Sequence, residues 1–323
     1  MIVDWLLVLV GLALLIAGGE ALVRGGSGIA LLAKISPTVV GLTIVAAGTS
    51  APELVVSVQA AFKGSTGLAL GNVVGSNLFN MGMTMGLAAT ITPLAIVGNT
   101  VRLEWPVMTI ATAQLYLLAR DGTVDRLEGA FLFGGMVVFI VYSVWVARKA
   151  TIPAEQQQAE ASVVTASFGK TGGAALALNL LAVLLGVGML AGGSTALVSG
   201  AVSIATTLGL SDTVIGLTIV AGGTGTPELV TTLLASRRGQ NDVAIANILG
   251  SNIFNVLGIA GATALIHPLP VPEEIITRDG WWLIGASLLL FPLMRSHMKI
   301  TRVEGLLLLA GYVTYMVLLI NSL

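Results

Sequence analysis

The sequence predicts an all-α membrane protein with about ten transmembrane helices, arranged as two inverted-topology five-helix repeats whose central helices are broken. Three observations carry this prediction. Of the 323 residues, 55% are hydrophobic and only 10% are charged, with a mean hydropathy of +0.96, whereas an ordinary soluble domain has roughly 25% charged residues. A long motif occurs twice, and each copy places a proline and a glutamate inside an apolar stretch.

The individual helices follow from apolar stretches that charges, prolines and polar clusters delimit, since a span needs about 20 apolar residues. The predicted spans are residues 5–33, 38–62, 67–90, 103–118, 127–147, 174–206, 214–236, 243–266, 281–294 and 303–320. The first begins at the N-terminus and is longer than the core of a signal peptide, so we expect it to be retained. The first and the sixth are long enough to be tilted.

Residues 41–80 and 216–255 are copies of one another. They align without a gap at an offset of 175, with about 21 of 40 positions identical, which indicates a duplication. The one extended polar connection lies between them. We therefore divide the chain into a first five-helix repeat over residues 1–150, a linker over residues 151–170, and a second repeat over residues 171–323.

The orientation of the repeats follows from the offset and from the basic residues. The offset spans about five helices, an odd number, so the second copy enters the membrane from the opposite face. Four of the fifteen basic residues fall on the side of the N-terminus and eleven on the other. Because cytoplasmic loops are enriched in Lys and Arg, we expect both termini outside and residues 148–170 in the cytoplasm. A compact, all-membrane chain favours a prokaryotic cytoplasmic (inner) membrane.

Composition also excludes several kinds of protein. The chain has no cysteine, which excludes disulfides, thiolate metal sites and cysteine nucleophiles. Its net charge is -1 and its basic residues are scattered, which excludes a nucleic-acid-binding surface. Ten spans use roughly 200 positions, so no sizeable soluble domain fits. We expect no cofactor, and no protein partner is evident.

The strongest functional signal is a pair of glutamates, Glu53 and Glu228, at equivalent places inside hydrophobic helices. A carboxylate at this depth costs at least a few kcal/mol, so it marks a functional site unless it only joins helices as a protonated core residue. Pro52 and Pro227 precede the two glutamates. A proline inside a helix removes a backbone hydrogen bond, so we expect a break whose freed carbonyls are candidate ion ligands.

Further oxygen-bearing side chains accompany each glutamate. A threonine lies four residues before it, and the next helix has a serine and an asparagine at the same spacing, which places each pair on one helical face. The pairs are Thr49 with Glu53, Thr224 with Glu228, Ser76 with Asn80, and Ser251 with Asn255. If the repeats face each other, these side chains line one oxygen-rich place near the bilayer midplane.

The ligand type indicates the ion. Oxygen ligands suit hard cations such as Ca2+, and neither of the duplicated segments, residues 41–80 and 216–255, contains the histidine or cysteine that zinc, copper or iron would favour. Two glutamates supply about -2 charge, which one Ca2+, two Na+ or two protons would each neutralise. Competition between such ions for one site is a ready mechanism for exchange.

Four motifs resemble the sodium/calcium exchanger family of the cation/Ca2+ antiporter superfamily. They are GTSAPE (48–53), GTGTPE (223–228), GNVVGSNLFN (71–80) and ANILGSNIFN (246–255). The resemblance covers the whole chain in helix count, although residue matching is strong only in the two repeats. It implies an antiporter whose four central helices bind Na+ and Ca2+ alternately while the two long helices slide against them. The connection at residues 148–170 is too short for the regulatory Ca2+-binding domains of animal exchangers.

The resemblance also implies a set of ligands. These are the carboxylates of Glu53 and Glu228, hydroxyl or backbone atoms of Thr49, Ser50, Thr224, Ser76 and Ser251, side-chain oxygens of Asn80 and Asn255, and main-chain carbonyls of Ala46 and Ala221. Two positions depart from the family. Gly225 replaces the usual partner of Ser50, so one hydroxyl is missing, and we expect a serine there to raise Na+ affinity. Asn255 is an aspartate in some prokaryotic members.

Three alternatives stay open. A Ca2+/H+ exchanger would use the same glutamates. The missing hydroxyl at Gly225 supports this alternative, because it removes one possible ligand for Na+. A membrane-embedded lipid-phosphate enzyme would want arginine or histidine beside the glutamates, and neither repeat has one there. A passive channel fits less well, because broken helices with a compact carboxylate pair are more typical of a tight binding site.

Overall fold

The computed structural model describes residues 2–33, 37–62, 64, 66–96, 100–149, 173–208 and 221–321. These parts are mostly helical, and each of the ten predicted spans coincides with helix where it is described. The predicted linker at residues 151–170 lies outside the described residues, as do residues 214–220 at the start of the seventh predicted span. The predicted all-α membrane fold is therefore confirmed in the described residues.

The described helices of residues 1–150 fall into five successive groups, which correspond to the five spans expected there. They are α1 (Ile2–Ala33); α2 (Pro37–Val40), η1 (Gly41–Val45), α3 (Ala46–Thr49) and α4 (Ala51–Phe62); α5 (Thr66–Leu78), η2 (Phe79–Thr84) and α6 (Met85–Ile91); η3 (Thr100–Glu104) and α7 (Trp105–Leu118); and α8 (Arg126–Lys149). The segments η1, η2 and η3 are π-helical, a wider helix that is often found at functional sites.

The second repeat has the same order. Its helices are α10 (Gly173–Thr207); α12 (Ala221–Thr224) and α13 (Thr226–Arg237); α14 (Asn241–Ile253), η6 (Phe254–Ala260) and α15 (Gly261–Ile266); η7 (Ile275–Asp279) and α16 (Gly280–Arg295); and α17 (Arg302–Asn321). In the described residues five helical stretches are long and apolar enough to cross a membrane, and α3 with α4 forms a further, bent candidate.

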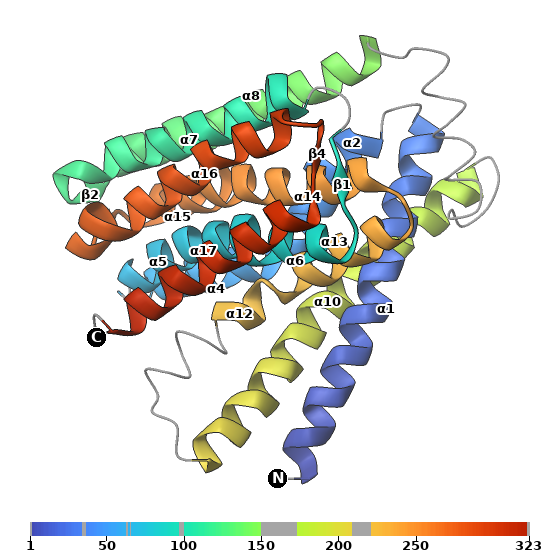
Figure 1. Cartoon of the computed structure of the whole chain (residues 1–323), viewed down its shortest axis with the longest axis horizontal. Coiled ribbons are helices and arrows are strands. Elements are labelled where there is room, and N and C mark those ends of the chain that lie inside the picture. The colour runs from blue at the N-terminus through green and yellow to red at the C-terminus, as the bar shows by residue number, and fades with distance from the viewer. Residues whose placement is uncertain are drawn as a thin grey trace.

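Two small antiparallel sheets relate the repeats in space. The strand β1 (Leu94–Ala95) pairs with β4 (Lys299–Ile300), and β2 (Thr123–Val124) pairs with β3 (Leu269–Pro270). Each sheet therefore joins one strand from each repeat, and the two sheets lie at opposite ends of the molecule (Figure 1). This exchange of partners is what an inverted repeat predicts.

The two long helices α1 and α10 pack against each other along a seam of glycines. Glycines recur every seven residues, at Gly11, Gly18 and Gly25 in α1 and at Gly186, Gly193 and Gly200 in α10. A Cβ atom on Gly11 would lie 2.8 Å from the carbonyl oxygen of Gly193, and one on Gly193 would lie 2.9 Å from that of Gly11. Small residues at this spacing let two membrane helices approach backbone to backbone.

The remaining spans pack around α14 and its continuation. In the most apolar 18-residue window of the stretch 241–266, 94% of the residues are buried, against 17 to 33% in the corresponding windows of the other long spans. Helix α14 contacts η1, α3, α7 and α13, so elements of both repeats surround it (Figure 1). The centre of the molecule is consequently where the two copies of the sequence motif meet.

Candidate cation site

Each repeat contains a helix break just before its glutamate. Helix α3 ends at Thr49, Ser50 forms a turn, and α4 continues from Ala51 at an angle of 52°. Pro52 lies in the first turn of α4, where its missing N–H has no intrahelical partner to lose. The prediction of broken central helices is confirmed, and the break places Glu53 in the first turn of a new helix, where the helix dipole stabilises negative charge.

The second break has the same form. Helix α12 ends at Thr224, Gly225 forms the turn, and α13 begins at Thr226 with Pro227 and Glu228 in its first turn. Both glutamates therefore sit at helix N-termini that follow a break. Thr49 and Glu53 lie on either side of the bend rather than on one continuous helical face, so the fold, and not the four-residue spacing alone, decides which oxygens meet.

The two glutamates are buried inside the helical core, and a hydroxyl of the first repeat contacts the carboxylate of the second. Each glutamate is only 1% exposed. The hydroxyl of Ser50 donates a hydrogen bond of 2.9 Å to Oε1 of Glu228, which joins the break of one repeat to the carboxylate of the other. Oε2 of Glu228 and both carboxylate oxygens of Glu53 have no donor.

Thr49 extends this contact between the repeats. Its hydroxyl lies 3.3 Å from Oδ1 of Asn247 and 3.4 Å from the hydroxyl of Ser251, both on α14. The amide nitrogen of Asn247 donates to the hydroxyl of Thr232 at 3.1 Å. Asn72, the equivalent of Asn247, makes the matching bond to Ser57 at 2.9 Å.

Four asparagines cross-link α5 and η2 of the first repeat to α14 and η6 of the second. Nδ2 of Asn80 donates to Oδ1 of Asn252 at 3.1 Å, and Nδ2 of Asn255 donates to Oδ1 of Asn77 at 2.9 Å. These bonds engage the amide nitrogens and leave Oδ1 of Asn80 and of Asn255 buried without a donor. The sequence analysis missed Asn77 and Asn252, and also Asn72 and Asn247, although identity between the two copies singles them out.

The site as a whole has a surplus of acceptors. Five buried oxygens without a donor belong to Glu53, Glu228, Asn80 and Asn255. Asn80 lies on η2, which contacts α13, and Asn255 lies on η6, which contacts α4, so each amide is on a segment that packs against a glutamate-bearing helix. Buried acceptors without a partner are costly. A hard cation is the ligand that would satisfy carboxylate and amide oxygens together.

The other predicted ligands belong to the same helices or to the helices next to them. Ser76 is buried, and Thr224 and Ala221 are the last and first residues of α12. The carbonyl of Ala46 accepts a bond from the backbone N–H of Ser50 at 3.0 Å and one from the Thr49 hydroxyl at 3.2 Å. Their part in binding remains a prediction.

The residue that forms the turn differs between the two breaks, being Ser50 in the first and Gly225 in the second. A Cβ atom on Gly225 would lie 2.5 Å from Cδ1 of Phe79, so the aromatic ring already fills the place of a side chain there. The ring also makes an edge-to-face contact with Tyr312 on α17, with centroids 5.8 Å apart. The expectation that a serine at position 225 simply restores a ligand therefore changes, because Phe79 must move to admit it.

Comparisons with known proteins agree with this architecture. The profile of the sodium/calcium exchanger protein family matches residues 3–145 and 178–321. This chain belongs to the sodium/calcium exchanger family. It is 39% identical to a putative antiporter, CaxA, of Alkalimonas amylolytica over the full length of both chains. It is 30% identical to the sodium/calcium exchanger MaX1 of Methanosarcina acetivorans, with 98% of each chain covered.

The exchanger fold is also similar to solved structures of the sodium-calcium exchanger NCX_Mj. One of them matches with a TM-score of 0.82 and 28% sequence identity over 98% of both chains. The family consists of membrane transporters, so this exchanger is a multi-pass membrane protein and not an enzyme. The lipid-phosphate enzyme considered from the sequence is thereby excluded.

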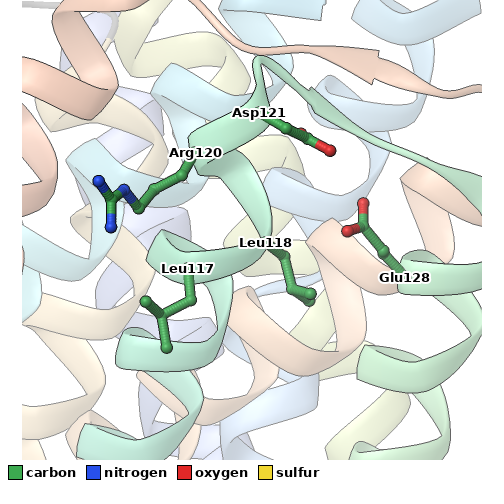
Figure 2. A pocket seen from close by; sticks show the side chains of 5 residues that line it. All are labelled: Leu117, Leu118, Arg120, Asp121 and Glu128. Carbon is green, nitrogen blue, oxygen red and sulfur yellow. The ribbon is translucent and has the colours of Figure 1, made fainter.

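The exchanger has a second cluster of acidic side chains, at its surface, and the hydrogen bonds of Glu128 there cap a helix. A surface hollow of about 460 Å³ at the end of α7 is lined by Leu117, Leu118, Arg120, Asp121 and Glu128 (Figure 2). Oε2 of Glu128 accepts the backbone N–H of Asp125 at 2.8 Å, and Oδ1 of Asp125 accepts that of Glu128 at 2.8 Å. This reciprocal pair is a capping box for α8.

A charged cluster links a long helix to the core. Glu20 on α1 forms an ion pair with Arg24, one turn further along the same helix, at 2.5 Å, and it also pairs with Arg238, which follows α13. The second partner could not be predicted from the sequence, because Arg238 comes from the other repeat. The three side chains are 24 to 39% exposed, so the cluster is separate from the buried glutamates.

Proposed function

We propose that this chain exchanges Ca2+ for Na+ by alternating access at a cation site between the two repeats, near the bilayer midplane. The observation that carries the proposal is the set of five buried acceptor oxygens without a donor. Ca2+ takes about 6 to 8 oxygen ligands, so further ligands are needed. We assign these to hydroxyl or backbone atoms of Thr49, Ser50, Thr224, Ser76 and Ser251 and to the carbonyls of Ala46 and Ala221.

The exchange would follow from the electrostatics of the glutamates. Two buried carboxylates without cations are strongly unfavourable in the low dielectric of a membrane. An ion therefore leaves readily only when others replace it, and this couples the two fluxes. The breaks at Ser50 and Gly225 divide each glutamate-bearing span into two arms, which allows the site to face either side in turn.

Gly225 bears on which monovalent ion, Na+ or H+, drives the exchange. A missing hydroxyl leaves fewer ligands for Na+, whereas a proton needs only the carboxylates of Glu53 and Glu228. This observation favours Ca2+/H+ exchange as the second candidate, with the same site and the same fold.

We further propose that the chain lies in a cytoplasmic (inner) membrane with both termini outside and the linker at residues 151–170 inside, between repeats over residues 1–150 and 171–323. Because the chain has no cysteine, single cysteines report its orientation directly. Thr123→Cys at the β2–β3 end should react with an impermeant maleimide from outside the cell, and Lys299→Cys at the β1–β4 end should not. The reverse labelling would invert the assignment.

The transport experiment uses purified protein in proteoliposomes. Uptake of radiolabelled Ca2+ is compared in vesicles loaded with Na+, in vesicles with a pH gradient and no Na+, and in matched vesicles with Glu53→Gln. We expect uptake driven by the outward Na+ gradient and none with the variant. Uptake driven only by the pH gradient would establish Ca2+/H+ exchange, and uptake that needs no counter-ion would indicate a channel.

A further inference from the structure

A groove of about 320 Å³ lies between α16, α17 and the segment formed by the end of α5 and η2, and its lining contains none of the predicted cation ligands. Helices α16 and α17 both contact η2. The floor of the groove is formed by Leu78 and Met81, which are only 4% and 1% exposed. Its rim is formed by Trp281 and Leu307, which are 59% and 58% exposed. The groove therefore leads from the outer surface of the helices to the buried segment η2.

Two glycines leave the groove hollow. Gly285 lies on α16 and Gly311 lies at the middle of α17, and both line the groove. A Cβ atom added to either glycine would meet no described atom within 4 Å. A larger side chain at these positions would consequently occupy the groove without displacing its neighbours.

The corresponding place in the first repeat is filled. The segments RLEG (126–129) and RVEG (302–305) align α8 with α17, and this alignment pairs Gly311 with Gly135. A Cβ atom on Gly135 would lie 3.7 Å from the side chain of Leu257, in ordinary contact. At the offset of 175, Gly82 stands in the place of Leu257, and Gly285 stands in the place of Ile110. The hollow thus comes from these substitutions and not from the fold.

The surroundings of the groove indicate what fills it. The apolar window of α17 is 17% buried, the smallest share among the five long described spans, so this side of the molecule faces lipid. The lining is mainly apolar, and the hydroxyl of Tyr315 is engaged with Asp279 at 3.3 Å, so the groove offers few partners to water.

The size of the groove selects among apolar occupants. Its volume of about 320 Å³ is about twice that of a cavity of roughly 150 Å³ that holds one benzene ring. A helix of a second copy is about 10 Å across with its side chains, which is too thick to enter. A single hydrocarbon chain is narrow enough. An empty groove would lose van der Waals contacts along its whole lining, so a chain from the bilayer is the occupant that fits.

The aromatic rings in the groove continue to the second break. The ring of Trp282 lies 5.6 Å from that of Tyr315, Tyr315 lies 6.4 Å from Tyr312, and Tyr312 lies 5.8 Å from Phe79, measured between ring centroids. The first three rings line the groove, and Phe79 lies against Gly225. An occupant of the groove therefore supports the series of rings that ends at the turn of the second break.

We propose that this groove binds one acyl chain of a membrane phospholipid, and that the bound chain holds the rings of Tyr312 and Phe79 against the second break. Binding of the chain does not depend on which ions are carried, whereas its effect on transport rests on the proposed exchange. A chain gains no hydrophobic free energy by leaving the bilayer for the groove, so packing contacts decide its binding. We therefore expect a straight chain to bind better than a chain with methyl branches.

Photolabelling tests the binding. The exchanger is placed in vesicles of phosphatidylcholine, a fraction of which carries a photoreactive diazirine in one acyl chain, and the labelled residues are identified by mass spectrometry. We expect label on the buried Met81 as well as on Leu306 of α17, which is 54% exposed outside the groove. An unlabelled Met81 would overturn the proposal. Label on Met81 that appears only after the protein is diluted in the membrane would assign the groove to a second copy and would overturn it as well.

A matched pair of substitutions locates the binding. Gly285→Leu places a side chain in the groove, and we expect the labelling of Met81 to fall at least about tenfold while that of Leu306 is unchanged. Gly134→Leu makes the same change at an exposed glycine of α8, where a Cβ atom also meets no described atom within 4 Å, and should leave both labels unchanged. Equal labelling of Met81 in the two variants would overturn the proposal. If Gly285→Leu fails to fold, Gly311→Leu replaces it.

The rate of Ca2+ exchange tests the link to the second break. In vesicles of a methyl-branched phospholipid we expect the unmodified protein and Gly134→Leu to exchange several-fold more slowly than in vesicles of a straight-chain phospholipid. Gly285→Leu should have the same rate in both, because its own side chain occupies the groove. Equal rates for the unmodified protein in both lipids would overturn the link to the break. Absence of exchange in every lipid would refute the proposed function itself, and the photolabelling would still decide whether the groove binds lipid.

Discussion

The two halves of the cation site share a backbone and differ in chemistry. Both have a break, a proline and a glutamate in the first turn of the next helix. At the first break Ser50 donates to the carboxylate of Glu228, whereas at the second Gly225 lies against the ring of Phe79 and the oxygens of Glu53 have no donor. The comparison teaches that duplication preserved the geometry of the site while single substitutions made its ligands unequal.

The largest expected effect comes from removing either charge. Glu53→Gln and Glu228→Gln should each reduce Ca2+ exchange by at least about 100-fold, because each removes half of the buried negative charge and on the order of 3 kcal/mol or more of binding. Proteoliposome uptake measures the loss, with Glu273→Gln on an exposed residue as the control. If either folded variant still transports Ca2+, that glutamate is not part of the site.

A smaller effect is expected from placing a side chain at the second break. Gly225→Ser should lower the melting temperature of the purified protein, because overpacking against Phe79 costs about 1–3 kcal/mol. Adding Phe79→Leu should recover part of the loss and let the new hydroxyl approach Glu53. The control is Gly188→Ser, where no described atom would meet the new Cβ within 4 Å. Equal stability of both single variants would show that Phe79 does not limit position 225.

Removing the hydroxyl at the first break should make the two halves alike. Ser50→Gly eliminates the hydrogen bond to Glu228, and we expect a roughly tenfold change in apparent cation affinity, in line with about 1.5 kcal/mol for a bond to a charged group. Thr226→Ala is the matched control, since its hydroxyl bonds only to the carbonyl of Gly222 at 2.8 Å. Identical affinities in the two variants would contradict a role for Ser50.

The smallest effect is expected outside the site. Arg238→Gln removes the ion pair that Glu20 makes with the second repeat, and partly exposed pairs contribute about 0–1 kcal/mol. We expect a change in exchange rate of less than about fivefold that high salt abolishes. Arg237→Gln, next to it and exposed, should have no effect. A loss of activity like that of the glutamate variants would place Arg238 in the mechanism.

The fold could be predicted from the composition and the internal repeat, because each of them depends on the arrangement of the membrane spans. Long apolar stretches mark spans, and an offset over an odd number of helices marks inversion. The duplicated glutamates and prolines likewise indicated the breaks. The side-chain contacts between the two repeats could not be predicted from the sequence, because they depend on the angles at which the helices cross. Thus Asn77 and Asn252 were identical in both copies without any sign that they hold the amides of Asn255 and Asn80.

Phe79 shows the same limit in another way. It recurs as Phe254 in the second copy, and an aromatic residue in an apolar helix is typical of core packing. Only the fold brings its ring against Gly225, which is distant in the sequence. The missing hydroxyl was visible in the sequence, but the side chain that fills its place was not.

The glycine seam between α1 and α10 has a mechanical consequence. Backbone contacts recur only every seven residues, so a shift of one helix along the other by a single turn would drive side chains into the facing backbone. We therefore expect the two helices to move together as one rigid pair. Because α1 contacts α13 and α10 contacts α3, a displacement of this pair relative to the core changes the helix contacts beside both breaks at once.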